Sequence, residues 1–189
     1  ERGVCSFMAQ LALVRHGESE YNSRNLECGW IDAPLTELGK QQAREAAQKL
    51  KEIKWDYIFE SDLIRSKQTT DEILKILNDG DIVRISSPAI KERNYGIYAG
   101  KDKSEVSQEI RRGWEVPIPE GETLKDVYNR VVPYYETEIL PKLKEGKNVI
   151  IPAHGNSLRA LVKYLKNISD EDITNLEIPV GEVLIVDYT

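Results

Sequence analysis

Short apolar segments that alternate with longer amphipathic segments constrain the fold of this 189-residue chain more than any other feature. The apolar segments have the length of buried strands, and the amphipathic segments repeat their apolar residues at helical spacing. Strands are predicted at residues 11–14, 57–59, 82–85, 149–151 and 183–188. Helices are predicted at residues 37–54, 62–77, 103–112, 124–139, 157–166 and 170–176, with Thr36, Ser61 and Thr123 as N-caps.

This alternation predicts an α/β protein, a three-layer sandwich in which helices cover both faces of a mostly parallel central sheet. No repeat or low-complexity tract divides the chain, so we expect one domain over residues 8–189. Met8 is the only methionine, and the residues before it lack the apolar region of a signal peptide. Residues 1–7 are therefore predicted to be a cloning remnant, with a short native extension as the alternative.

Composition argues against several classes of function. The net charge of -6 and the pI of about 5.2 are unlike the basic surface of a nucleic-acid-binding protein. The apolar segments are far shorter than the roughly 20 residues that a membrane-spanning helix needs. Two cysteines, Cys5 and Cys28, form no CxxC motif and indicate a reducing compartment. We expect a cytoplasmic protein without nucleic-acid or membrane partners, and both a homodimer and a monomer remain open.

The chain has only two histidines, and both follow a predicted strand in matching sequences. His16 and His154 are each followed by glycine, a polar residue and serine. Ligands of open α/β sheets bind at the carboxyl ends of strands, so we expect both histidines at one site. Arg15, Arg159 and the N-terminus of the helix after His154 attract anions, and histidine can act as a nucleophile. The pattern predicts a phosphate site, whereas two unrelated turn histidines are the alternative.

Metal and nucleotide sites lack motifs in this sequence. No HExxH pattern or cysteine ligand set accompanies the histidines, so no metal is expected. The chain also has no GxxxxGK[ST] or GxGxxG loop, which argues against nucleotide binding.

The segments around both histidines resemble the signature motifs of the histidine phosphatase superfamily. They read Leu-Val-Arg-His-Gly-Glu-Ser at residues 13–19 and Ala-His-Gly-Asn-Ser-Leu-Arg-Ala-Leu at residues 153–161. Between residues 11 and 188 the chain resembles, more narrowly, the cofactor-dependent phosphoglycerate mutases. The segments Glu-Arg-Asn-Tyr-Gly at residues 92–96 and Gly-Glu-Thr-Leu-Lys-Asp at residues 121–126 are similar to segments of that family.

This resemblance implies an enzyme of glycolysis and gluconeogenesis that interconverts 3-phosphoglycerate and 2-phosphoglycerate, a small phosphorylated three-carbon acid. It implies a phosphohistidine intermediate, 2,3-bisphosphoglycerate as the priming phosphate donor, and no metal. By resemblance, His16 is the nucleophile, Glu92 is the general acid–base, and Arg15, Arg65 and His154 surround the phosphoryl group. The substrate-binding residues that it implies are Ser19, Asn22, Cys28, Gly29, Arg65, Tyr95, Lys103, Arg111, Arg112, Gly155 and Asn156.

Departures from the mutase pattern keep two other hypotheses open. Cys28 replaces a hydroxyl residue with a weaker hydrogen-bond donor. The segment between Lys103 and Arg111 is shorter than is usual in the family, and the chain ends at its last predicted strand, where family members often continue. A more open site favours hydrolysis, so the first alternative is a histidine phosphatase that acts on another small phosphorylated metabolite. The second is a non-catalytic phospho-ligand or protein-binding module, which the full set of motif residues argues against.

Overall fold

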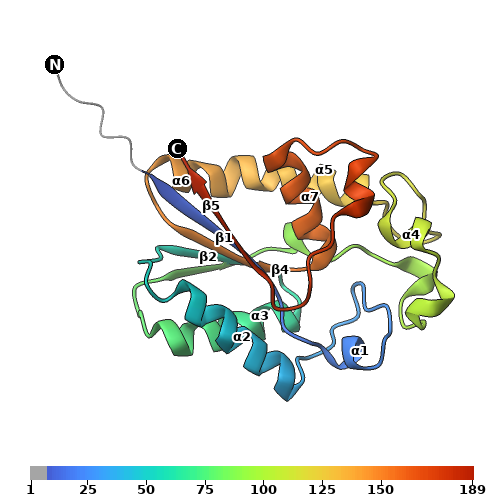
Figure 1. Ribbon diagram of the computed structural model, residues 1–189, viewed down its shortest axis with the longest axis horizontal. Helices are drawn as coiled ribbons and strands as arrows, with labels where there is room; N and C mark the ends of the chain where they lie inside the picture. Colours follow the sequence, from blue (N-terminus) through green and yellow to red (C-terminus); the bar gives the residue numbers. More distant parts are fainter. Residues whose placement is uncertain (1–7) are drawn as a thin grey trace.

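A computed structural model describes residues 8–189, and a five-stranded sheet with helices on both faces forms its centre (Figure 1). The strand order is β3-β2-β4-β1-β5. The strands are β1 Ala9–Arg15, β2 Tyr57–Glu60, β3 Val83–Ser86, β4 Val149–Ala153 and β5 Val183–Tyr188. Neighbouring strands are parallel except β5, which pairs antiparallel with β1 at one edge. The predicted α/β sandwich with a mostly parallel sheet is confirmed, while the prediction for residues 1–7 lies outside the described residues.

Two groups of helices form the outer layers (Figure 1). One face of the sheet is covered by α2 (Glu37–Leu50) and α3 (Ile64–Leu77). The opposite face is covered by α5 (Leu124–Tyr134), α6 (Leu140–Lys144) and α7 (Gly155–Lys166). The remaining helices are short: α1 Glu20–Ser23, α4 Gln108–Arg112, and the 3-10 turns Pro88–Ile90, Gly96–Tyr98, Lys103–Glu105 and Asp172–Asn175.

The side chains of β1 alternate between two apolar cores, as the two-residue period of a strand requires. Leu11 and Leu13 are buried in the core beneath α5 and α7. Ala12 and Val14 are buried in the core beneath α2 and α3. A strand that is buried on both faces reads as a continuous apolar run, which is why this segment was recognisable in the sequence.

Several predicted elements differ in detail from the structure. The predicted helix 124–139 is interrupted, because α5 ends at Tyr134 and a π-helical turn, Tyr135–Ile139, joins it to α6. Pro133 and Pro141 flank this turn, and proline supplies no backbone N–H for a regular helix. The predicted helix 103–112 is divided because Ser107 caps a new helix, α4, at its middle.

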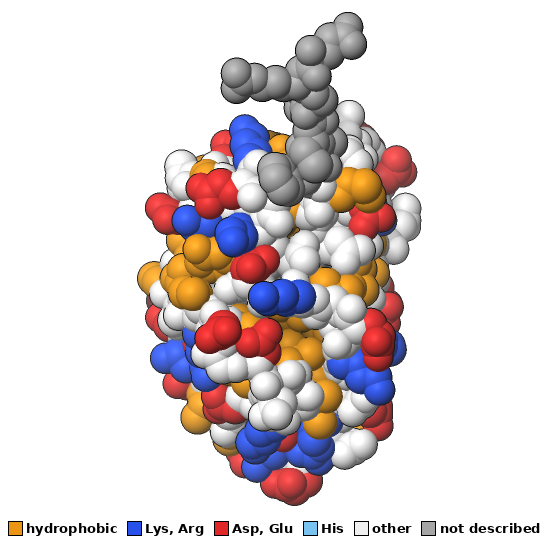
Figure 2. Space-filling model, turned by 90° about the vertical axis from the view of Figure 1, so that its left-hand side faces the viewer, with side chains coloured by type: hydrophobic (Ala, Val, Ile, Leu, Met, Phe, Trp, Pro, Cys, Tyr) orange, Lys and Arg blue, Asp and Glu red, His pale blue; other side chains and the backbone are white. Residues whose placement is uncertain are grey.

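Charges of both signs are dispersed over the end of the molecule where α6 lies. Figure 2 shows acidic and basic side chains interspersed with small apolar groups on this face. Within residues 8–189, no helix combines the length and the apolar character needed to cross a bilayer.

Candidate active site

The two histidines meet because β1 and β4 are adjacent parallel strands. Arg15 pairs with Ala153 at their carboxyl ends, and each histidine is the next residue in its chain segment. The backbone N–H of His16 donates to the Ala153 carbonyl at 3.0 Å. The two imidazole centroids are 5.1 Å apart, and the residues are 3% and 0% exposed. The expectation that these distant residues share one site is confirmed.

The His16 ring is neutral and has one nitrogen with a free lone pair. Its Nδ1 lies 2.6 Å from the Gly17 carbonyl oxygen, which can only accept, so Nδ1 carries the proton and Nε2 keeps its lone pair. Burial, followed by the positive charges of Arg65 and Arg15, holds the pKa of His16 well below 6.5. The imidazole is therefore neutral at pH 7, as nucleophilic attack through Nε2 requires.

His154 is held by a hydroxyl from another strand-to-helix connection. Its Nε2 lies 2.6 Å from Ser61 Oγ, which also accepts the Leu63 backbone N–H at 3.2 Å. The hydroxyl proton is then available to Nε2, and the proton of the neutral ring resides on Nδ1. Burial and the charge of Arg65 lower the pKa of His154 well below 6.5 and keep the ring neutral. The ring thus holds a buried N–H donor beside His16.

This contact overturns the prediction that Ser61 is a helix N-cap. Helix α3 begins at Ile64, and its N-cap is Leu63, which provides no side-chain cap. The Ser61 hydroxyl is instead directed to His154, the residue that follows the neighbouring strand β4. The sequence contained no signal for this role, because the partner lies far away along the chain.

Three buried donors near the histidines have no hydrogen-bond partner within residues 8–189. They are Arg15 Nε, Arg65 Nε and His154 Nδ1. Other guanidinium nitrogens anchor the arginines: Arg15 Nη1 donates to the Ile178 carbonyl, and Arg65 donates to the carbonyls of Gly29 and Ile31. Buried donors are rarely left unpaired, and charged donors bind phosphate oxygens strongly. This donor set fits a phosphoryl group.

Glycine follows each histidine for a different steric reason. A Cβ on Gly17 would lie 2.0 Å from the Gly39 carbonyl oxygen, so the turn after β1 can pack on α2 only without a side chain. A Cβ on Gly155 would lie 3.2 Å from Arg15 Cζ. Gly155 therefore leaves room for the Arg15 guanidinium at the start of α7.

Glu92 contributes a carboxylate to the same site. Its Oε1 accepts the backbone N–H groups of Arg93 at 2.7 Å and Asn156 at 3.1 Å. In the described part of the chain its Oε2 has no hydrogen-bond partner. The residue is 8% exposed and lines the cavity, so Oε2 is the oxygen available for proton transfer.

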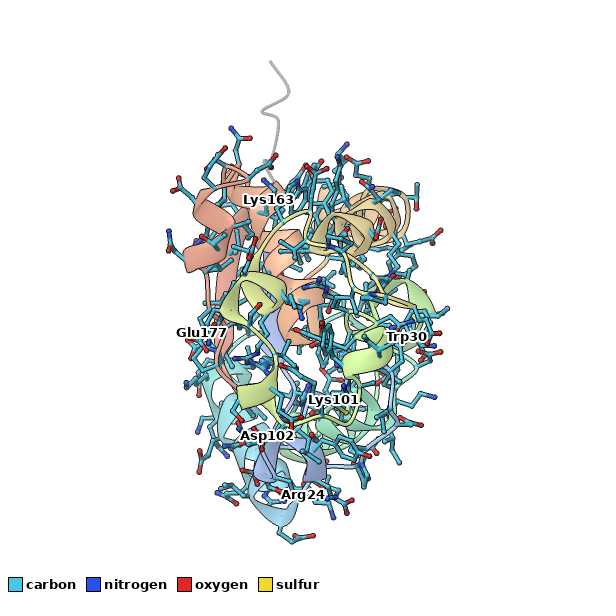
Figure 3. All side chains as sticks on the ribbon, turned by 90° about the vertical axis from the view of Figure 1, so that its right-hand side faces the viewer. Arg24, Trp30, Lys101, Asp102, Lys163 and Glu177 are labelled. Atoms are coloured by element: carbon cyan, nitrogen blue, oxygen red, sulfur yellow. The ribbon has the colours of Figure 1, made fainter. Side chains whose placement is uncertain are left out.

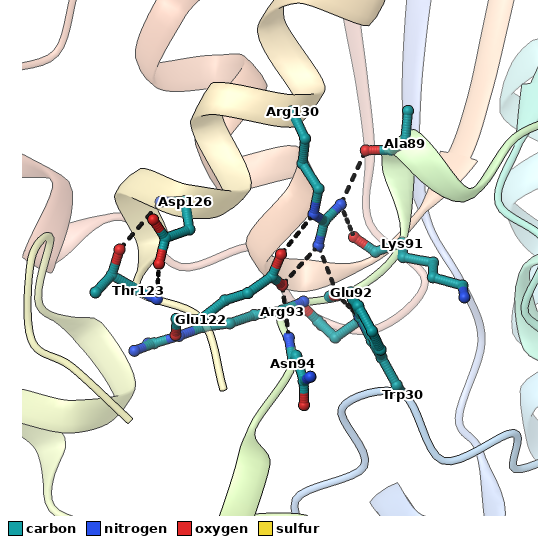
Figure 4. A network of polar contacts seen from close by, with 10 residues as sticks. All are labelled: Trp30, Ala89, Lys91, Glu92, Arg93, Asn94, Glu122, Thr123, Asp126 and Arg130. Atoms are coloured by element: carbon teal, nitrogen blue, oxygen red, sulfur yellow. Dashed lines mark hydrogen bonds and ion pairs between the residues drawn. The ribbon is translucent and has the colours of Figure 1, made fainter. Parts of the chain in front are cut away.

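A network of arginine contacts holds the Glu92 segment (Figure 4). Arg130 donates to the carbonyls of Ala89, Lys91 and Glu92 and pairs with Glu122. Trp30 Nε1 donates to the Glu92 carbonyl at 2.7 Å, on the other side of the segment. These contacts fix the backbone that carries the carboxylate.

Arg93 ties the same segment to the loops beyond it. It is fully buried and donates to the carbonyls of Ile110, Val116 and Glu122. Sequence reasoning did not identify the supporting roles of Arg93, Glu122 and Arg130. Only the position of Arg93 inside the Glu-Arg-Asn-Tyr-Gly segment could have suggested one.

The site opens into a cavity of about 360 Å³. The predicted site residues that line it are Arg15, His16, Asn22, Cys28, Gly29, Arg65, Glu92, Tyr95, Lys103, Arg111, Arg112, Gly155 and Asn156. Two predicted residues lie behind its wall: His154 reaches the site through its ring, and Ser19 is fully buried and caps α1 by accepting the Asn22 N–H. Arg159, which the sequence analysis placed at the phosphate site, lines it as well. The lining residues absent from the prediction are Glu18, Leu26, Glu27, Gln42, Glu177, Ile178, Pro179 and Val180.

Some lining groups already have protein partners. All three guanidinium nitrogens of Arg159 donate to protein oxygens, so this arginine supports the wall rather than offering a free donor. The Cys28 thiol donates to the Ile31 carbonyl at 3.2 Å, and burial raises its pKa. Burial also raises the pKa of Tyr95 to about 12, which keeps its hydroxyl protonated beside Asn156.

The arginine pair in the cavity lining carries two carboxylate partners. Arg111 Nε lies 2.6 Å from Glu27 Oε1, and Arg112 Nη2 lies 2.8 Å from Glu177 Oε1. The Glu27 side chain is 6% exposed and that of Glu177 is 66% exposed. Figure 3 shows Glu177 and Trp30 on opposite sides of this end of the molecule.

The described residues contain no group of three or more His, Cys, Asp or Glu side chains arranged to hold a metal ion.

Sequence and structure comparisons relate the chain to known proteins. The profile of the histidine phosphatase superfamily (branch 1) matches residues 11–189. A protein of Parvibaculum lavamentivorans named 2,3-bisphosphoglycerate-dependent phosphoglycerate mutase is 42% identical over 93% of this chain and 88% of its own. A protein of Lactiplantibacillus plantarum, named 2,3-bisphosphoglycerate-dependent phosphoglycerate mutase 2, is 38% identical over 96% of this chain and 94% of its own.

Two solved structures illustrate the structural likeness. Phosphoglycerate mutase from Bacillus anthracis aligns with a TM-score of 0.80 at 22% identity over 97% of this chain and 89% of its own. A mycobacterial glucosyl-3-phosphoglycerate phosphatase aligns with a TM-score of 0.79 at 24% identity over 94% of this chain and 90% of its own. At these identities the likeness concerns the fold alone.

Proposed function

The chain belongs to the histidine phosphatase superfamily, and we propose that it is a 2,3-bisphosphoglycerate-dependent phosphoglycerate mutase. It would interconvert 3-phosphoglycerate and 2-phosphoglycerate in the cytoplasm, as a step of glycolysis and gluconeogenesis. The observation that carries the proposal is the set of unpaired buried donors on Arg15, Arg65 and His154 beside the neutral His16. The names of relatives about 40% identical support the choice of substrate.

In this proposal the residues around His16 perform reversible phosphoryl transfer. Bound 2,3-bisphosphoglycerate supplies the phosphoryl group that primes the enzyme. His16 Nε2 attacks phosphorus as the bond to the donor oxygen breaks, and Glu92 Oε2 delivers the proton to that oxygen. In the return step the Nε2–P bond breaks, and Glu92 removes the proton from the attacking substrate hydroxyl. Arg15, Arg65 and His154 stabilise the transferring group, and each such donor is worth roughly 10²–10³ in rate.

The other end of the substrate would be held by the far side of the cavity. Lys103, Arg111 and Arg112 supply cations for a carboxylate and a second phosphate. Asn22 and the backbone around Gly29 and Asn156 would complete the polar lining. A ligand with more than one anionic group matches this lining, because it holds these three cations in addition to Arg15 and Arg65.

A histidine phosphatase with another small phosphorylated substrate is the second candidate. It is favoured by the carboxylates that already accompany both Arg111 and Arg112, because these leave less positive charge for a second anionic group. If the intermediate is held weakly, transfer of the phosphoryl group to water competes with return to substrate.

The two candidates are separated by 31P NMR of the protein with 3-phosphoglycerate and a chelator, with and without catalytic 2,3-bisphosphoglycerate. A mutase forms 2-phosphoglycerate on addition of bisphosphate and releases little inorganic phosphate. Inorganic phosphate as the main product identifies a phosphatase. If neither product appears and no phosphohistidine forms, the mutase proposal is wrong.

A further inference from the structure

We propose that Glu27 is a specificity-determining residue that weakens the binding of bisphosphorylated ligands more than that of monophosphorylated ligands. The inference rests on the proposed function. Glu27 lies in the loop after α1, where its backbone N–H donates to the Lys101 carbonyl and its carbonyl accepts the Gly100 N–H. Two backbone hydrogen bonds therefore hold the residue in place, and its side chain lines the cavity.

The carboxylate faces the cations proposed to bind substrate. Its Oε1 accepts the Nε–H of Arg111 at 2.6 Å. In residues 8–189 neither Nη atom of Arg111 has a hydrogen-bond partner. Among the charges around Lys103, Glu27 most strongly opposes the lowering of the Lys103 pKa by burial. Glu27 thus leaves the donors of Arg111 free for a ligand while it reduces the positive charge that the ligand meets.

Burial distinguishes Glu27 from the other acidic partner in the arginine pair. Glu177 is 66% exposed, so solvent and salt screen its charge. Glu27 is only 6% exposed, and its field inside the cavity is screened much less. The proposed transfer steps assign a task to Glu92 but need no carboxylate at Glu27. A buried negative charge in a cavity for anions opposes ligand binding, and this cost calls for a functional explanation.

The opposition grows with the charge of the ligand, because Coulomb energy is proportional to it. A bisphosphate with a carboxylate carries one more phosphate group than 3-phosphoglycerate and is repelled more by Glu27. The residue would thereby keep the bisphosphate exchangeable at a smaller loss of affinity for the monophosphate. Replacing the carboxylate with an amide keeps an oxygen acceptor for Arg111 Nε, removes the negative charge and replaces the second oxygen with an NH2 donor.

The test is isothermal titration calorimetry in a His16→Ala background, which binds ligand without turnover. We compare 2,3-bisphosphoglycerate and 3-phosphoglycerate in the parent and in the same protein with Glu27→Gln. The Kd for the bisphosphate should fall about tenfold and that for 3-phosphoglycerate about threefold, as expected for a partly screened charge. Glu45→Gln, which removes an exposed carboxylate from α2 outside the cavity, is the matched control and should change neither value.

The proposal would be overturned if Glu27→Gln changed the Kd values of both ligands by the same factor, changed neither, or raised the Kd of the bisphosphate. Glu27→Asp keeps the charge, so it should leave the ratio of the two Kd values unaltered. A raised preference of this variant for the bisphosphate would also contradict the proposal. If Glu27→Gln does not unfold cooperatively, the smaller neutral Glu27→Ser replaces it and the same ratio decides. The Kd ratio is measured in the His16→Ala background and therefore does not depend on catalysis. If that ratio shifts but the unmodified protein has no mutase activity, only the proposed function is rejected. Mutase activity with an unshifted ratio rejects only this inference.

Discussion

The turn after β1 and the turn after β4 have nearly the same sequence but use it differently. Both contain histidine, glycine, a polar residue and serine. In the first turn, Ser19 caps the short helix α1, and the His16 ring donates to the next carbonyl along the chain. In the second, Ser157 accepts the backbone N–H of His154, whose ring is held by Ser61 from another segment. The local sequence repeats, whereas the hydrogen-bond partners of the two rings do not.

This difference teaches that the partner of one ring nitrogen determines the chemistry of the other. A carbonyl acceptor at Nδ1 leaves His16 with a free lone pair. A hydroxyl at Nε2 leaves His154 with a free N–H. Two residues in similar turns thereby differ in what they can offer a ligand, and these are the differences that the proposed roles of nucleophile and donor require.

Replacing each histidine with alanine should have the largest effect on activity and should distinguish the two turns. His16→Ala should abolish the phosphoenzyme and mutase activity, because no other group supplies the nucleophile. His154→Ala should retain the phosphoenzyme and lose roughly 10²–10³ in rate, since it removes one donor. Incorporation of label from 32P-labelled 2,3-bisphosphoglycerate and steady-state kinetics measure both effects. Full activity in a folded His16→Ala protein would reject the assigned nucleophile.

Ser61→Ala tests whether the hydroxyl determines the tautomer of His154. We expect kcat to fall about 10- to 100-fold with a smaller change in KM, because the donor is lost only from part of the population. The 15N chemical shifts of the His154 ring should move toward a mixture of tautomers, a change that simple loss of packing would not cause. Ser23→Ala, at an exposed serine of α1, is the control. An unchanged tautomer in Ser61→Ala would contradict the assignment.

Alanine substitutions of the glycines after the two histidines should differ, with one reducing mainly stability and the other mainly activity. Gly17→Ala places a methyl group against the backbone of Gly39 and should lower the free energy of unfolding by about 1–3 kcal/mol or more. Gly155→Ala meets the movable end of Arg15, so it should reduce stability less and activity more. Urea unfolding and kcat/KM of the two variants test this contrast, which fails if both lose the same property.

The smallest expected effect of the two histidines is on the pH dependence of the free energy of unfolding. Burial lowers the pKa of both rings below 6.5, so in the window below that value the unfolded chain binds more protons than the folded one. Stability is therefore fully retained above pH 6.5 and falls as the pH decreases, by up to about 1.4 kcal/mol per pH unit for each histidine. Urea unfolding between pH 7 and 5 measures the slope, which should be shallower in His16→Gln than in the unmodified protein. Identical slopes would show that His16 does not carry the expected shift.

Local features of the fold were predictable because their periods are short. The apolar run of β1 and the spacing of α2 repeat within a few residues. Thr36 and Thr123 cap helices as predicted, since each accepts an N–H three residues ahead. The position of both histidines directly after strands then made a shared site predictable from topology alone.

The resemblance to a known family named most of the cavity lining, but not the contacts that define each residue's task. Arg159 was expected to offer charge to a phosphate, yet its nitrogens are all engaged with protein oxygens. Ser61 was expected to cap a helix and instead holds His154. Glu27 was not singled out, although it faces Arg111 inside the cavity.

The sequence by itself determined the strands, the long helices α2 and α3, and the position of each histidine directly after a strand. Only the tertiary structure decided that β4 lies between β1 and β2, and therefore that Ser61 reaches His154. The same holds for the contact between Glu27 and Arg111. The physical reason is that backbone periodicity is encoded by near neighbours, whereas a side chain's partner depends on which distant segment packs beside it.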